Sequence, residues 1–127
     1  MPIIEPFLLI WAGVLCAMTA IVHSVLGERK LIAPLLADGT GVMKSDYARQ
    51  ITRFAWHWTT LLWLLVAAVL VLAGTEGVGN RWLVAAIGAA HLGAGLYDAI
   101  VTRGKHIGWP LLVLVGALVL TSLYLTK

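Results

Sequence analysis

Four long runs of apolar residues, separated by polar links, set the pattern of the chain. They extend approximately over residues 7–26, 54–73, 82–101 and 107–125. A hydrocarbon core about 30 Å thick takes about 20 helical residues to cross, so each run is long enough for one transmembrane helix. Little of the chain remains outside the runs. The pattern therefore predicts an all-α integral membrane protein, a four-helix bundle that forms a single domain over residues 1–127.

The link between the first two runs is the only long one, and it has a pattern of its own. Gly27 is expected to let the chain turn after the first helix. Residues 31–36 are apolar but too short to span, and Pro34 interrupts them, so they are expected to lie in the interface as a short amphipathic turn. Ser45 is placed to cap a helix with Asp46 in its first turn, which predicts that the second helix starts near residue 46 and protrudes into the cytoplasm.

The other two links are short. Residues 74–80 form a glycine-rich connection, and residues 102–106 form a tight one. Short connections place consecutive helices side by side in opposite directions, so the second, third and fourth helices are expected to be antiparallel neighbours in an up-down bundle.

Composition supports a membrane protein and excludes several other classes. Hydrophobic residues make up 61% of the chain and charged residues 12%, which is too apolar for a water-soluble globule. Cys16 is the only cysteine, which excludes an internal disulfide and a cysteine-rich metal site. The first apolar run is preceded by Glu5 and lacks a basic leader, so it is expected to remain as a helix rather than to act as a signal peptide.

The positions of the nine basic residues predict the orientation, because basic residues in short loops stay in the cytoplasm. Two of them, Arg81 and Lys127, fall on the side of the chain ends. The other seven fall on the opposite side, in the first and third links: Arg29, Lys30, Lys44, Arg49, Arg53, Arg103 and Lys105. Both termini are therefore expected outside the cytoplasm, in a multi-pass protein of the inner (plasma) membrane. The net charge of +3 is a topology signal, and nucleic-acid binding is not expected.

Three polar side chains are expected at one depth near the cytoplasmic face. His23, His57 and Asp98 each lie about three residues inside the end of a different predicted helix, or about 5 Å below the interface. Imidazoles and carboxylates inside a membrane are costly, so they point to a functional site or to buried pairs. Together they form a ligand set for zinc, iron or copper, with Glu28 or His106, just outside this layer, completing the shell.

A second group of polar residues surrounds this predicted site. His91 lies about two helical turns deeper than Asp98 and is expected to reach Cys16 or Thr19. Arg53 and Arg103 flank the cytoplasmic end.

Three hypotheses follow from these residues. The first is a transition-metal site. The second is haem b held between His23 and His57, with Arg53 or Arg103 near the propionates. In the third, the polar residues only fix helix packing, for example with Asp98 paired to Arg53 or Arg103, in an accessory protein that forms a homo-oligomer or joins a larger membrane complex. None of the three indicates a particular reaction, so whether the protein is an enzyme stays open.

Three short segments carry a resemblance to known proteins. The stretch from His23 to Arg29 reads HSVLGER, the stretch from Arg53 to His57 reads RFAWH, and Gly108 begins a late GWP. In these segments the chain resembles a group of small bacterial four-helix membrane proteins. The resemblance implies the topology and a bacterial origin, and it implies no reaction. Thiol-based quinone reductases are not similar, because they need paired cysteines.

Overall fold

The computed structural model describes residues 4–125, and this part of the chain is helical with no β-strand. The elements are α1 (Ile4–Gly27), the π-helical turn η1 (Glu28–Ile32), α2 (Ala33–Asp38), the 3₁₀ turn η2 (Gly41–Lys44), α3 (Asp46–Glu76), α4 (Arg81–Val101) and α5 (Trp109–Leu125). The prediction of an all-α protein is confirmed. The four long helices α1, α3, α4 and α5 coincide with the four apolar runs.

Three helical segments are long and apolar enough to cross a membrane, namely Ile4–Asp38, Asp46–Glu76 and Arg81–Val101. The shorter apolar helix α5 has 17 residues within the described range. At a rise of 1.5 Å per residue, the 35 residues of the first segment and the 31 residues of α3 extend over about 52 and about 46 Å. Both exceed a hydrocarbon core of about 30 Å.

The first helix continues past the point where the sequence predicts a turn. Gly27 has φ −64° and ψ −42°, so it is helical, and the helix runs on through η1 into α2. Pro34 does not interrupt it, because this residue lies in the first turn of α2, directly after η1, where the Ala33 N–H donates to the Glu28 carbonyl. The predicted turn at Gly27 is therefore wrong, and residues 31–36 continue the first helix and do not form a separate turn.

A close contact with α3 explains why residue 27 is glycine. A Cβ atom on Gly27 would lie 2.1 Å from Cζ2 of Trp56. The indole of Trp56 thus occupies the space that any other side chain at position 27 would need.

The start of α3 agrees with the prediction. Ser45 caps the helix, its hydroxyl accepting a hydrogen bond from the Ala48 N–H at 3.4 Å, and Asp46 is the first helical residue. The predicted extension of this helix from about residue 46 is confirmed.

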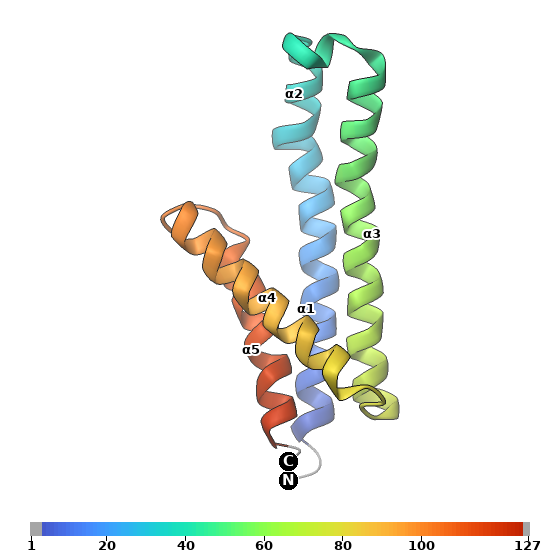
Figure 1. Ribbon diagram of the computed structural model, residues 1–127, viewed down its shortest axis with the longest axis vertical. Helices are drawn as coiled ribbons and strands as arrows, with labels where there is room; N and C mark the ends of the chain where they lie inside the picture. The colour runs from blue at the N-terminus through green and yellow to red at the C-terminus, as the bar shows by residue number, and fades with distance from the viewer. Residues whose placement is uncertain (1–3, 126–127) are drawn as a thin grey trace.

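The helices form two hairpins that separate at one end. Helix α1 packs against α3 and α5, and α4 packs mainly against α5, whereas α3 and α4 barely touch. Figure 1 shows the α4–α5 hairpin leaning away from the long α1–α3 pair, while the start of α1 and the end of α5 lie together. There the Ser122 hydroxyl donates to the Glu5 carbonyl at 3.2 Å. The second and third long helices, α3 and α4, were expected to be neighbours. Their contact is minor, and α5 packs against α1 instead.

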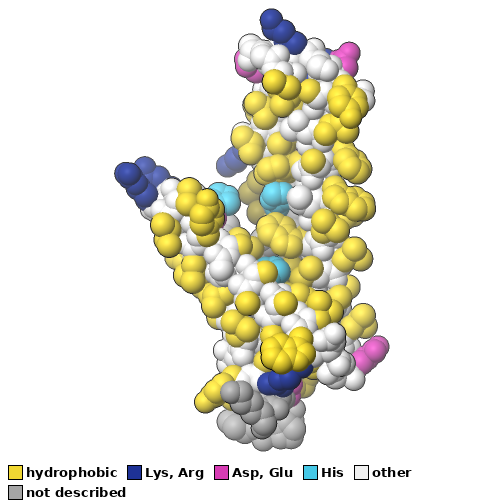
Figure 2. All heavy atoms as spheres, in the orientation of Figure 1, with side chains coloured by type: hydrophobic (Ala, Val, Ile, Leu, Met, Phe, Trp, Pro, Cys, Tyr) yellow, Lys and Arg dark blue, Asp and Glu magenta, His cyan; other side chains and the backbone are white. Residues whose placement is uncertain are grey.

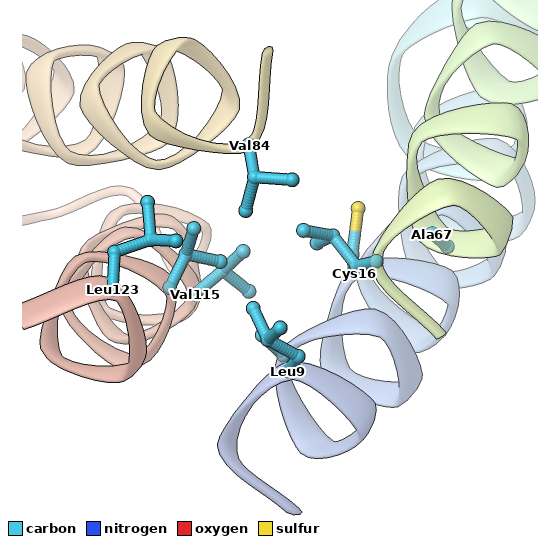
Figure 3. Packing of buried hydrophobic residues seen from close by; sticks show 9 residues of the cluster. Leu9, Cys16, Ala67, Val84, Val115 and Leu123 are labelled. Carbon is cyan, nitrogen blue, oxygen red and sulfur yellow. The ribbon is translucent and has the colours of Figure 1, made fainter. Parts of the chain in front are cut away.

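The core lies where α1, α3, α4 and α5 converge. Figure 3 shows Leu9 of α1, Val84 of α4 and Val115 of α5 directed into one space, with Cys16 of α1 and Leu123 of α5 on either side of it.

Glycines allow the close approach of α4 and α5. A Cβ on Gly95 would lie 2.7 Å from the Val113 backbone nitrogen, and one on Gly88 would lie 2.9 Å from the Val119 side chain. The small-residue face of α4 therefore admits α5 as a close neighbour.

Candidate functional site

A chain of four polar side chains joins α1 and η1 to α3. The Ser24 hydroxyl lies 2.8 Å from His57 Nδ1, and His57 Nε2 lies 3.2 Å from Oε2 of Glu28. The other carboxylate oxygen of Glu28 pairs with Arg53 at 2.9 Å. We call Ser24, Glu28, Arg53 and His57 the polar clasp. It brings together three residues that were singled out from the sequence, namely Glu28, Arg53 and His57.

The partners determine how the neutral His57 ring is protonated within the clasp. A carboxylate only accepts hydrogen bonds, so Nε2 carries the proton and donates to Glu28. Nδ1 is then left with a lone pair and accepts the hydroxyl proton of Ser24. Glu28 in turn receives donors from both His57 and Arg53. Each polar group of the clasp therefore has a protein partner.

Sequence spacing explains the geometry of the polar clasp. Ser24 and Glu28 are four residues apart, as are Arg53 and His57, so each pair lies on one face of its helix. Ser24 was not among the predicted site residues. The matching i, i+4 spacing on two antiparallel helices is the signal that could have identified it.

His23 lies next to the clasp but makes different contacts. Its ring stacks on Trp56 with centroids 4.1 Å apart, and it meets the edge of Trp63 at 5.3 Å. Its Nε2 lies 3.3 Å from the Thr59 hydroxyl. His23 and His57 therefore lie at one level of the α1–α3 pair, as expected. They make different contacts, because His23 of α1 packs on Trp56 and Thr59 of α3, whereas His57 of α3 contacts Ser24 and Glu28.

Asp98 is held within the other hairpin. Its carboxylate pairs with His106 Nδ1 at 2.5 Å, which connects the end of α4 to the loop before α5. The expected packing partners were Arg53 and Arg103. Instead Arg53 binds Glu28, and Arg103 lies in the α4–α5 turn with a positive φ of 53°.

His91 makes the predicted contact with Cys16. The sulfur lies 3.7 Å from His91 Nε2, and His91 Nδ1 lies 2.8 Å from the Ile87 carbonyl. Because that carbonyl only accepts, Nδ1 carries the proton of a neutral ring and Nε2 keeps its lone pair beside the sulfur. The single S–H of Cys16 also lies within reach of the Trp63 carbonyl, 3.6 Å from the sulfur. Both side chains are buried, so this contact ties α1 to α4 inside the core.

The residues predicted to share a metal ion are thus distributed over separate pairs. Within residues 4–125, no three His, Cys, Asp or Glu side chains are grouped so that they could hold a metal ion. Glu28 and His57 form one pair, Asp98 and His106 another, and His23 rests on tryptophan. The structure brings the two histidines of the α1–α3 pair to one level and keeps the Asp98–His106 pair in the second hairpin.

The order hydroxyl, imidazole, carboxylate in the polar clasp is also the order of a nucleophilic triad. Such a triad acts with hydrogen-bond donors that stabilise the developing oxyanion. Ser24 lies inside α1, where the neighbouring backbone N–H groups already donate to carbonyls one turn earlier. These donors are therefore engaged within the helix.

Figure 2 shows how charge and imidazole are distributed over this face. Lys and Arg side chains show near the two ends of the molecule, at the tip of the α4–α5 hairpin and in the gap between the hairpins. Hydrophobic side chains cover the long helices, and His side chains show beside this gap. No protein-family model matches the chain, and comparisons with curated proteins and with solved structures find no match either.

Proposed function

We propose that this chain is a multi-pass membrane protein in which the polar residues join helices, and that its role is accessory or oligomer-forming rather than catalytic. The observation that carries the proposal is the pairing of the polar groups with one another. His57 and Arg53 engage Glu28, His106 engages Asp98, and Cys16 engages His91. In a lipid environment such pairs reduce the cost of polar side chains and fix the register of the helices.

Membrane insertion rests on length and charge. Helices α1, α3 and α4 are long enough to span, and we assign the fourth crossing to α5, whose 17 described residues are at the lower limit of the usual range. Seven basic residues on the loop side against two on the side of the chain ends favour both termini outside the cytoplasm, in a bacterial inner membrane. A reporter fused after Lys127 should be active outside the cytoplasm, and cytoplasmic activity would overturn this orientation.

Assembly with another helix is supported by the outer face of α4. Ala86, Ala89, Ala90 and Gly93 are exposed there, and a Cβ on Gly93 would meet nothing within 4 Å. Small residues at a membrane helix surface allow close helix contact, which supports a homo-oligomer or a larger complex. Gly93→Leu should lower the oligomeric mass measured by light scattering in detergent, and an unchanged mass would count against assembly through α4.

Metal binding by His23, His57 and Asp98, with Glu28 or His106, is the competing proposal. It requires the separate pairs to break and the two hairpins to approach each other. Haem b between His23 and His57 requires both imidazoles to leave their present partners on α1 and α3.

Unfolding with and without a chelator separates these proposals. A metal that binds only the folded chain stabilises it, so its removal lowers stability. We expect EDTA to leave the free energy of unfolding in detergent unchanged. A loss of stability on chelation in the wild type, absent in His57→Ala, would overturn the packing proposal in favour of the metal site.

A further inference from the structure

The long α1–α3 pair has an open cleft at the end away from the termini. It lies between α2 and the first two turns of α3 and has a volume of about 660 Å³. Its walls are lined by Ala33, Leu36, Ala37, Asp46, Arg49, Gln50, Arg53 and Phe54. Two guanidinium groups one helical turn apart thus share a cleft with apolar side chains from both helices.

The two arginines differ in how many of their N–H donors are used by contacts within the protein. Arg49 donates to the Met43 and Lys44 carbonyls and pairs with Asp46. Arg53 pairs with Glu28 through one terminal nitrogen, and half of its side chain (51%) is exposed. A guanidinium has five N–H donors, so the contacts of Arg53 within the described chain leave most of its donors available to a ligand.

The charge around the cleft favours an anion. Between residues 28 and 53 the chain carries five basic residues, Arg29, Lys30, Lys44, Arg49 and Arg53, against three acidic ones, Glu28, Asp38 and Asp46. Planar guanidinium groups bind phosphate oxygens in a bidentate manner, which makes phosphate the chemistry that fits this cleft.

An apolar stripe leads away from the cleft along α3. Phe54 lines the cleft and stacks on Trp58 with ring centroids 5.9 Å apart. Leu61 and Leu65 follow at helical spacing on the same face, and all four side chains are at least 48% exposed. The stripe therefore starts at the arginines and runs toward the middle of the apolar helix.

We propose that the cleft binds the phosphate of an anionic phospholipid whose acyl chain lies along Phe54, Trp58, Leu61 and Leu65. A free phosphate would use the arginines alone, whereas a phospholipid also covers the stripe. The inference rests on the proposed membrane insertion. It places the cleft at the cytoplasmic leaflet, where anionic lipids attract basic segments.

The test is lipid binding by purified protein in neutral detergent, measured by native mass spectrometry. Phosphatidylglycerol and phosphatidylcholine with identical acyl chains are offered at equal concentration, with inorganic phosphate as a separate competitor. We expect phosphatidylglycerol to be retained at least about fivefold better, in line with about 1 kcal/mol for one arginine at a lipid surface. This readout does not depend on orientation, so a wrong topology would appear in the reporter fusion and not here.

Matched variants locate the site. Gln50→Glu adds a negative charge to the cleft wall without removing an ion pair, and Lys105→Gln changes the net charge equally in the α4–α5 turn. The first should abolish the preference for phosphatidylglycerol and the second should retain it. Phe54→Ser should weaken phosphatidylglycerol binding, which tests the stripe.

Three results would overturn the proposal. One is equal retention of the two lipids by the wild type. Another is an equal loss of the preference in Gln50→Glu and Lys105→Gln. The third is full displacement of phosphatidylglycerol by millimolar inorganic phosphate together with no effect of Phe54→Ser, which would assign the cleft to free phosphate.

Discussion

The contact between Glu28 and His57 should contribute measurably to the stability of the α1–α3 pair. The perturbation is a double-mutant cycle made of Glu28→Gln, His57→Ala and the combined variant. His57→Ala removes the 3.2 Å contact between the carboxylate and the imidazole, and Glu28→Gln replaces the charged acceptor with a neutral amide oxygen. In His57→Ala the carboxylate keeps Arg53, and Ser24 loses its partner.

The expected coupling energy follows from the exposure of the two groups. Hydrogen bonds to a charged group contribute about 1.5–3 kcal/mol when they are shielded from water. The side chains of Glu28 and His57 are 26% and 39% exposed, so solvent screens part of this interaction. We therefore expect a coupling of about 1 kcal/mol, within the range of about 0.5–3 kcal/mol measured for residues in contact.

The assay is equilibrium unfolding in mixed detergent micelles, followed by helicity. A control cycle combines Glu28→Gln with His106→Ala, two sites that share no partner and should be additive within about 0.5 kcal/mol. If the Glu28–His57 cycle is as additive as the control, the polar clasp does not join α1 to α3, and the reasoning from its geometry fails.

Three further predictions concern packing and the second polar pair. Gly27→Ala should destabilise the protein by about 1–3 kcal/mol, because its Cβ would meet the Trp56 indole, whereas Gly93→Ala should be tolerated. Comparable melting temperatures of these two variants would contradict the contact between position 27 and Trp56. Gly95→Leu should disrupt the α4–α5 hairpin and lower the yield of folded protein. Leu114→Ile, at a position that is 45% exposed, should leave the yield nearly unchanged. Equal effects of the two changes would mean that the packing face of α4 is misassigned. His106→Ala should cost less stability than His57→Ala, about 1 kcal/mol or less, because the His106 side chain is 58% exposed, and a larger loss in the same unfolding assay would refute this order.

The sequence predicts most of the helical structure because periodicity and length are strong signals. The apolar runs define the four long helices, and Ser45 with Asp46 correctly marks the start of α3. The extent of the first helix could not be predicted. Gly27 and Pro34 are ordinary signs of a helix end, and their tolerance here depends on Trp56 and on the π-helical turn, both of which are known only once the helices are packed.

The sequence identifies residues of the candidate site, but it does not identify which of them contact one another. Counting from helix ends correctly places His23 and His57 at one level, since both lie on the directly packed α1–α3 pair. It does not reveal that the second hairpin leans away, which leaves Asp98 with His106. The rotation of α3 about its axis also decides that His57 contacts Glu28 and Ser24, and this rotation is not visible in the sequence.

The central claim is that these polar residues join helices and do not hold a cofactor. Its most direct test is elemental analysis combined with an absorption spectrum, made on purified wild type and on His57→Ala. The account predicts no Soret band and no stoichiometric zinc, iron or copper in either protein. One metal ion or one haem per chain in the wild type, lost in His57→Ala, would contradict it.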